Sequence, residues 1–254
     1  MPRDNQTPRD RAGRNRNEAA LVQLLPNLIT LAAICAGMTS IRFAVQADYM
    51  FAVQLVLLAC VLDGVDGRVA RLLRSDSKIG AELDSLADFL NFGIAPPLIL
   101  YFWGLQDIRS VAWIFVLFFS VCCVIRLARF NVDHKSEDAP GSATHFSGVP
   151  SPAGAVLVMM PLYLSFAFQH DKLPGLAICI YMVFVGLLMI SAVPTMSLKG
   201  VTISRANVKF FLVGVVLAGA AFFTFTWIAL FVLSACYLIT VGWSAVRKAR
   251  DLRK

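Results

Sequence analysis

The chain has 254 residues, of which 58% are hydrophobic and only 15% are charged, and its formal net charge at pH 7 is +7. A water-soluble domain has about 45–50% apolar and about 25% charged residues, so this composition excludes an ordinary soluble protein. The apolar residues form long runs separated by short polar loops, which predicts an all-α, polytopic membrane protein.

The hydrophobic runs predict a bundle of about eight transmembrane helices. Along the chain they cover residues 24–44, 50–73, 85–103, 111–130, 152–169, 174–193, 208–226 and 228–246. Almost no loop separates the last two, so we expect them to form a tight helical hairpin. The third run is the most polar, because it carries Asp88, Asn91 and two prolines. Such residues are tolerated in a span when they face a cavity lined by protein.

Basic residues predict the orientation of these helices. Lys and Arg crowd both ends of the chain and the loops after the second, fourth and sixth spans, whereas the opposite loops hold only Arg109 and Lys172. By the positive-inside rule, both termini are cytoplasmic, in the cell (cytoplasmic) membrane. We expect a disordered basic tail over residues 1–17, a membrane domain over 18–246 and a basic C-terminal tail over 247–254. This topology and attraction to anionic lipid explain the positive charge without nucleic-acid binding.

Four aspartates at the cytoplasmic ends of the second and third spans form the most informative cluster. Asp63 and Asp66 are three residues apart and share one face of a helix, and Asp84 and Asp88 are four apart and share a face of the next. Carboxylates at the edge of a bilayer need a compensating partner. Two such pairs make an oxygen cage for hard divalent cations, and two cations about 3.5–4 Å apart promote displacement at phosphorus. We therefore expect two divalent cations, Mg²⁺ or Mn²⁺, here.

Small and basic residues around the aspartates fit a phosphate ester. Gly67 follows Asp66 directly and lets a ligand approach the backbone, and Ala70 keeps the groove shallow one turn later. Arg71 offers a fork of donors suited to phosphate oxygens. Gly80 opens the start of the second helix in the same way. The cluster predicts a phosphoryl-transfer site that faces the cytoplasm.

These eight residues follow the pattern D-x2-D-G-x2-A-R, then eight residues, then G-x3-D-x3-D, with every specified position matched between residues 63 and 88. The pattern resembles the signature of the CDP-alcohol phosphotransferases. A chance match at eight positions is on the order of one in 10⁹ per start point. The resemblance implies an eight-span helical fold with a polar cavity, a homodimer, and Asp88 as general base in addition to its place in the metal cage.

The resemblance also implies residues that bind the CDP-linked donor. In the family, an Asn or Asp with a Thr three residues later meets the nucleotide, and here PNLIT at 26–30 provides Asn27 and Thr30. A Ser or Thr in the loop before the second carboxylate pair contacts the nucleotide phosphate, and of Ser75 and Ser77 in this loop Ser77 is the better placed. Together with Gly67, Ala70, Arg71 and Gly80, these residues form the expected site for CDP-diacylglycerol.

Three further stretches look like the phosphatidylserine synthase branch of that family. They are RLARFN at 126–131, FSGVPSPAG at 146–154 and VPTMSLKG at 193–200. The resemblance implies transfer of a phosphatidyl group from CDP-diacylglycerol to L-serine, with phosphatidylserine and CMP as products. Because arginine is the natural partner of a carboxylate, Arg126 and Arg129, with Asn131, are the candidates for binding serine.

Several alternatives stay open from the sequence. The acceptor could be glycerol 3-phosphate or inositol phosphate, bound by Lys199, Arg205 and Lys209, or it could be choline, which favours an aromatic or acidic cage. An ion-coupled transporter would spread its acids through the membrane depth, whereas these lie at one edge. A metal or lipid scaffold without catalysis would share the cage but would have no need of Asp88.

Overall fold

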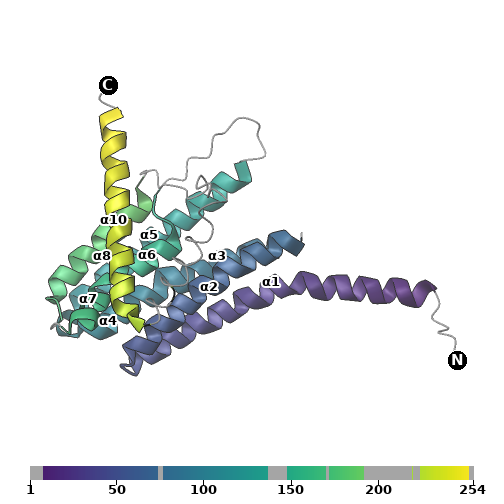
Figure 1. Cartoon of the computed structure of the whole chain (residues 1–254), viewed down its shortest axis with the longest axis horizontal. Helices are drawn as coiled ribbons and strands as arrows, with labels where there is room; N and C mark the ends of the chain where they lie inside the picture. The colour runs from purple at the N-terminus through teal and green to yellow at the C-terminus, as the bar shows by residue number, and fades with distance from the viewer. Residues whose placement is uncertain are drawn as a thin grey trace, which may run out of the picture.

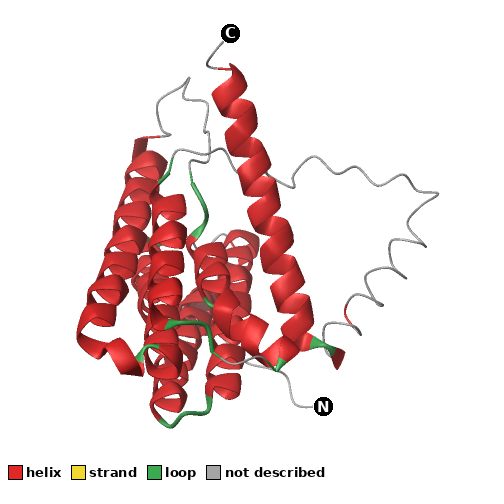
Figure 2. Ribbon diagram, turned by 90° about the vertical axis from the view of Figure 1, so that its left-hand side faces the viewer, coloured by secondary structure: helices red, strands yellow, loops and turns green. Residues whose placement is uncertain are grey.

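The computed structural model describes residues 8–73, 77–136, 148–169, 172–191, 219 and 224–251. Within these residues every regular element is a helix and there is no strand (Figure 2). This confirms the all-α class. The helices pack side by side as a bundle, with α10 along one side of it (Figures 1 and 2).

The helices follow the hydrophobic runs closely. In chain order they are α1 (Pro8–Val45), α2 (Tyr49–Leu73), α3 (Lys78–Asp88), the π-helix η1 (Phe89–Ile94), α4 (Ala95–Gly104), the short 3-10 helix η2 (Gln106–Ile108), α5 (Arg109–Ser136), α6 (Ser151–Val158), α7 (Met160–Phe168), α8 (Gly175–Ile190) and α10 (Thr226–Asp251) (Figure 1).

Five helical segments are long and apolar enough to cross a membrane. They are Leu24–Val45, Tyr49–Leu73, Ile79–Gly104, Gln106–Val132 and Thr226–Arg247. A sixth span forms if α6 and α7, bent by 41° at their junction, are taken together, and α8 is a shorter apolar helix. The chain is therefore a membrane protein of several helical spans. The predicted span 208–226 lies almost wholly outside the described residues, so the total of about eight spans and the cytoplasmic termini stay predictions.

The expected tails overlap helices. The tail predicted over residues 1–17 includes the start of α1 at Pro8, and the tail predicted over 247–254 includes the end of α10 at Asp251. Residues 1–7 and 252–254 lie outside the described residues, as do Lys199, Arg205 and Lys209. The disorder and the domain boundaries stay predictions.

The third span contains a helix break that separates the carboxylates of α3 from the buried helix α4. Pro96 and Pro97 stand in the first turn of α4, and because proline has no backbone N–H the regular helical ladder cannot run through them. The chain instead makes the π-helix η1 before α4 begins. The hydroxyl of Ser120 on α5 donates to the carbonyl of Gly93 in η1 at 2.8 Å, which satisfies a backbone group in the break. The carboxylates of α3 thus lie on the side of the break that is predicted to face the cytoplasm. The buried helix α4 lies on the other side.

Helices α1 and α2 pack against each other along the bundle through small side chains. Ala33 and Ala44 of α1 and Ala52 and Ala59 of α2 are all buried. Small residues allow two helix backbones to approach closely in a membrane, where dispersion rather than water exclusion holds helices together. This close pairing brings the start of the α1 span next to the aspartates of α2.

Candidate active site

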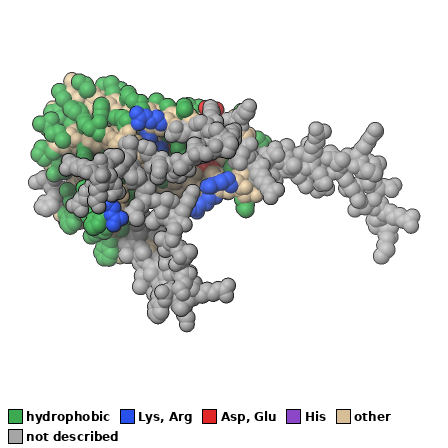
Figure 3. Space-filling model, turned by 90° about the horizontal axis from the view of Figure 1, so that it is seen from above, with side chains coloured by type: hydrophobic (Ala, Val, Ile, Leu, Met, Phe, Trp, Pro, Cys, Tyr) green, Lys and Arg blue, Asp and Glu red, His purple; other side chains and the backbone are tan. Residues whose placement is uncertain are grey.

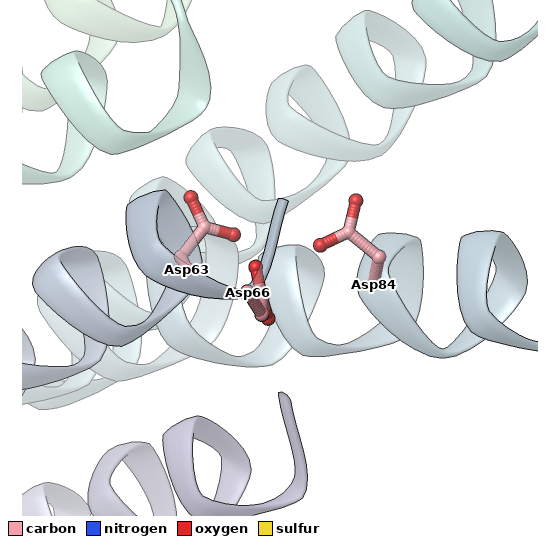
Figure 4. A group of neighbouring side chains, drawn as sticks. All are labelled: Asp63, Asp66 and Asp84. Atoms are coloured by element: carbon pink, nitrogen blue, oxygen red, sulfur yellow. The ribbon is translucent and has the colours of Figure 1, made fainter. Parts of the chain in front are cut away.

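Three of the four predicted aspartates form one group between α2 and α3 (Figure 4). Asp63 and Asp66 come from α2 and Asp84 comes from α3, and each offers a carboxylate oxygen that lies within 4.8 Å of the others. Asp66 is buried, with 3% of its surface exposed, whereas Asp84 is exposed. The group therefore runs from the interior of the bundle to its surface. In Figure 3, acidic and basic side chains lie beside each other at the edge of the hydrophobic surface.

The fourth aspartate, Asp88, lies beside this group of three and is not one of its members. It lies one helical turn after Asp84 on α3, and Asp63 and Asp84 are its electrostatic neighbours. Its Oδ1 atom is buried and has no hydrogen-bond partner among the described residues. The structure thus places Asp88 next to the cluster, with one oxygen free.

The carboxylate oxygens of Asp63, Asp66 and Asp84 are suited to binding a divalent cation. The hydroxyl of Thr30 on α1 donates to Oδ2 of Asp66 at 2.7 Å, while Oδ1 of Asp66 is buried and has no partner among the described residues. One oxygen is thus held in place and the other is left for a ligand. Carboxylate oxygens are the ligands that hard cations such as Mg²⁺ and Mn²⁺ prefer, and second-shell hydrogen bonds commonly orient such ligands.

The predicted nucleotide residues Asn27, Ser77 and Gly80 meet at the start of α3. Ser77 is the N-cap of this helix, and its Oγ accepts a hydrogen bond from the Gly80 amide at 2.9 Å. A Cβ atom on Gly80 would lie 2.9 Å from Oδ1 of Asn27 and 3.0 Å from Oγ of Ser77. Glycine at this position therefore lets α1 and the α3 cap approach each other. Thr30, predicted to join this set, instead directs its hydroxyl to Asp66.

Beside the aspartates, one face of α2 is open. A Cβ on Gly67 would meet no atom within 4 Å, so this position leaves room for a ligand. Arg71 is exposed, and its Nε donates to the carbonyl of Gly67 at 3.0 Å, which uses only one of its five N–H groups. Ala70 is half-buried between them. The face therefore has open space and an arginine beside it, and its predicted binding of phosphate stays a prediction.

The two arginines predicted to act together are directed to different partners. Arg126 donates through Nη1 to the hydroxyl of Ser151 at 2.5 Å, its guanidinium lies 5.7 Å from the ring centroid of Phe130, and it is within electrostatic range of Asp88. Arg129 is exposed and donates through Nη1 to the carbonyl of Ile190 at 2.9 Å. Arg126 therefore lies within electrostatic range of Asp88, whereas Arg129 joins α5 to the end of α8.

Asn131 links α5 to the helix of the aspartates. Its Nδ2 donates to the hydroxyl of Ser85 at 3.0 Å, and Ser85 directly follows Asp84 on α3. The end of α5 is thereby fixed beside the carboxylate group.

Two of the three stretches that resemble the phosphatidylserine synthase branch, 126–131 and 146–154, come together at the Arg126–Ser151 contact. We call this region, with the end of α8, the α5–α6–α8 junction (residues 126–131, 148–151 and 188–191). The amide of Val149 donates to the carbonyl of Leu188 at 3.3 Å. Gly148 has a φ of +90°, and a Cβ there would lie 2.6 Å from the carbonyl oxygen of Met189, so only glycine fits. The third stretch, 193–200, begins just after α8 and lies outside the described residues.

Comparison with known proteins agrees with this geometry. Residues 23–196 match the family model of the CDP-alcohol phosphatidyltransferases. The chain belongs to this family. The matched range includes every site residue named above, from Asn27 to Ser151 and Ile190, and ends before α10. Members of the family generally depend on divalent cations, in agreement with the group of Asp63, Asp66 and Asp84.

Relatives of this CDP-alcohol phosphatidyltransferase cover most of the chain. A protein of Mycobacterium leprae is 37% identical over 222 residues, which are 87% of this chain and 74% of the relative. One of Mycobacterium tuberculosis is 35% identical over 247 residues, 96% of this chain and 84% of the relative. One of Helicobacter pylori is 37% identical over 201 residues, 78% of this chain and 81% of the relative. All three carry the name CDP-diacylglycerol–serine O-phosphatidyltransferase.

Sequence reasoning missed two hydroxyl groups that bind residues of the candidate site. Ser85 binds Asn131, and Ser151 binds Arg126. Ser85 stands between two aspartates of the signature, at a position the signature leaves unspecified. Ser151 lies in the stretch FSGVPSPAG, in which the glycine and the prolines suggested a shaped turn; the turn was visible in the sequence, but its partner on α5 was not.

Proposed function

We propose that this chain transfers the phosphatidyl group of CDP-diacylglycerol to the hydroxyl of L-serine and releases CMP. The observation that carries the proposal is the position of Arg126, a side chain suited to binding a carboxylate, within electrostatic range of Asp88, which follows Asp84 by one helical turn. Relatives named for this reaction, which match 78–96% of the chain, support the same acceptor.

Two divalent cations, Mg²⁺ or Mn²⁺, are proposed at Asp63, Asp66 and Asp84, with Asp88 at the edge of their site. When bound, they would neutralise the diphosphate of the donor and stabilise the charge on the departing CMP. The free Oδ1 atom of Asp66 supports this assignment.

The donor CDP-diacylglycerol is proposed to lie along the open face of α2 and the start of α3. Gly67 and Ala70 leave room for the diphosphate, and Arg71 supplies N–H donors to its oxygens. Asn27, Ser77 and Gly80 form the end of the site that would hold the cytidine and its phosphate. Thr30 is proposed to contribute through its hydrogen bond to Asp66. These residues would hold the phosphorus that bears diacylglycerol next to the carboxylates.

Asp88 is proposed as the general base. Its free Oδ1 accepts the proton of the serine hydroxyl as the hydroxyl oxygen attacks the phosphorus that bears diacylglycerol. The bond from this phosphorus to the bridging oxygen breaks, and CMP leaves with the electron pair. Of the candidates Arg126, Arg129 and Asn131, Arg126 is proposed to bind the carboxylate of serine, so that the serine hydroxyl faces Asp88.

The proposed setting is the cytoplasmic membrane, with the site open to the cytoplasm and two chains forming a homodimer. The excess of Lys and Arg in the loops on the side of the aspartates supports the orientation. The homodimer rests on the resemblance to the family.

An acceptor screen tests the proposal. Purified protein in detergent micelles receives CDP-diacylglycerol, Mg²⁺ or Mn²⁺ and one alcohol at a time, and CMP release is followed. We expect release with L-serine and its loss in EDTA. Release only with glycerol 3-phosphate, inositol phosphate or choline would keep the mechanism and overturn the acceptor. Absence of release with any alcohol would contradict the enzymatic function.

A further inference from the structure

We infer that Ser151 is a positioning residue that fixes the guanidinium of Arg126 so that this arginine, rather than Arg129, binds the carboxylate of the acceptor. The inference rests on the proposed function and adds to it a specificity-determining hydroxyl outside the family signature.

The Arg126–Ser151 pair joins α5 to α6 at the α5–α6–α8 junction. Ser151 is fully buried at the first position of α6, and its Oγ lies 2.5 Å from Nη1 of Arg126 and 3.7 Å from Sγ of Cys123. On the other side, the Phe130 ring faces the guanidinium. A guanidinium is planar and carries five N–H donors, so one fixed N–H sets the direction of the other four.

Ser151 is itself held by the backbone around it. Pro150 precedes it and Pro152 follows it, and both have a fixed φ. The neighbouring turn is fastened to α8 by the hydrogen bond from the Val149 amide to Leu188 and by the close approach of Gly148 to Met189. A hydroxyl on such a turn loses little conformational entropy when it binds, so it can hold a long arginine side chain in one orientation.

Arg129 lacks these features. Its side chain is exposed, and Nη1 is bound to the backbone carbonyl of Ile190 at the end of α8. Arg126 is half-buried and lies within electrostatic range of Asp88, the proposed base. An alcohol whose carboxylate is bound by Arg126 therefore has its hydroxyl near Asp88. Binding by Arg129 does not require the hydroxyl to lie there.

The consequence is selectivity for an alcohol that carries a carboxylate. Serinol has a hydroxymethyl group where L-serine has the carboxylate, so a change in their ratio of kcat/KM between wild type and variant reports on the contact with the carboxylate. Without the Ser151 hydroxyl, the Arg126 guanidinium is free to take other orientations. Binding of a carboxylate then weakens, while binding of CDP-diacylglycerol at α2 and α3 does not change.

The test compares Ser151→Ala, Ser151→Thr and the control Ser40→Ala, all as full chains in micelles. Ser40 is also fully buried, but its hydroxyl donates to the carbonyl of Gly37 on its own helix. We expect Ser151→Ala to raise the KM for L-serine about tenfold and to lower the serine-over-serinol preference about tenfold, because a hydrogen bond to a charged group is lost. The KM for CDP-diacylglycerol and kcat should stay within about twofold. Ser151→Thr keeps a hydroxyl and should restore most of the preference, and Ser40→Ala should leave it unchanged.

A serine KM and a serinol preference that stay unchanged in Ser151→Ala would overturn the inference while the proposed function stands. If kcat fell and the KM values for both substrates rose together in Ser151→Ala and Ser151→Thr, with the serine-over-serinol preference unchanged, Ser151 would have a packing role only. That result would also overturn the inference. Wild-type protein that uses serinol but not L-serine would overturn the proposed function and the inference together.

Discussion

The two sides of the site are built in different ways. The carboxylate side comes from two consecutive helices, α2 and α3, and its aspartates fall between residues 63 and 88. The α5–α6–α8 junction comes from three helices, and its contacts join residues up to 61 positions apart, as between Arg129 and Ile190. The first side has a spacing that can be recognised along the chain, whereas the second exists only after the bundle has formed.

This difference suggests a division of labour. The carboxylate side is common to enzymes that use a CDP-linked donor, because any acceptor needs the same diphosphate to be neutralised. The junction is the side that can vary with the acceptor alcohol. Substitutions on the carboxylate side should therefore impair every acceptor equally, and substitutions at the junction should change the choice among acceptors.

The largest effect is expected for Asp66→Asn. This substitution removes a ligand charge from the group of three aspartates, and CMP release should fall at least about 10³-fold with every acceptor. Electron paramagnetic resonance should show loss of bound Mn²⁺. Asp107→Asn, at the exposed position of helix η2, is the matched control and should behave as wild type. Full Mn²⁺ binding by Asp66→Asn would contradict the metal assignment.

Asp88→Asn separates base from ligand. Loss of the general base should lower kcat by about 10²–10⁴-fold, whereas Mn²⁺ binding at the other three aspartates and the KM for CDP-diacylglycerol should change little. The asparagine side chain is nearly isosteric, so folding should be preserved. If Asp88→Asn lost Mn²⁺ as completely as Asp66→Asn, Asp88 would be primarily a metal ligand.

On the other side, Arg126→Ala and Arg129→Ala should differ. Removing a charge-assisted hydrogen bond costs about 1.5–3 kcal/mol, so Arg126→Ala should raise the KM for L-serine about 100-fold. Arg129→Ala removes a bond to the Ile190 carbonyl and should raise it only a few-fold, with a lower thermal unfolding midpoint. Steady-state kinetics with both substrates measure this difference. Equal effects of the two variants would remove the distinction between them.

Thr30→Val tests whether α1 acts on the metal or on the nucleotide. Valine has the same shape but cannot donate to Asp66, so the affinity for Mn²⁺ should fall about tenfold, and Thr30→Ser should restore it. Metal affinity is read both from Mn²⁺ binding and from the metal dependence of CMP release. A raised KM for CDP-diacylglycerol with unchanged Mn²⁺ affinity would instead favour the direct nucleotide contact that the sequence resemblance implies.

The smallest effects are expected at two glycines that look alike in sequence. Gly80→Ala crowds Asn27 and Ser77, whose side chains can shift, so it should cost about 1 kcal/mol of stability and raise the KM for CDP-diacylglycerol about threefold. Gly67→Ala meets open space and should fold at least as stably, yet raise the same KM. Thermal unfolding and donor saturation separate the two. A destabilised Gly67→Ala would contradict the open face.

Much of the fold followed from hydrophobic runs, but its breaks did not. The run over residues 152–169 suggested one span, whereas the helix breaks at Met159 between α6 and α7, next to Pro161. The π-helix before Pro96 was also not predicted. In both places a proline removes a backbone donor, but the sequence alone does not show whether the helix bends, ends or changes its pitch.

In the site, the contacts between distant segments could not be predicted from the sequence. The spacing of Asp63, Asp66 and Asp84 was enough to expect them together, because helix periodicity fixes their faces. The same periodicity suggested a common role for Arg126 and Arg129, but long side chains three positions apart can reach different partners, and here they do. The role of Ser151 could not be seen before α6 was placed against α5.

The most direct test of the central claim follows L-serine into lipid. Radiolabelled L-serine, CDP-diacylglycerol and Mn²⁺ are incubated with the purified chain, and the labelled lipid and the released CMP are measured in the same sample. We expect labelled phosphatidylserine and CMP in a ratio of about one to one, both lost in Asp88→Asn. CMP that appears without labelled lipid would mean hydrolysis rather than transfer and would contradict the proposed function.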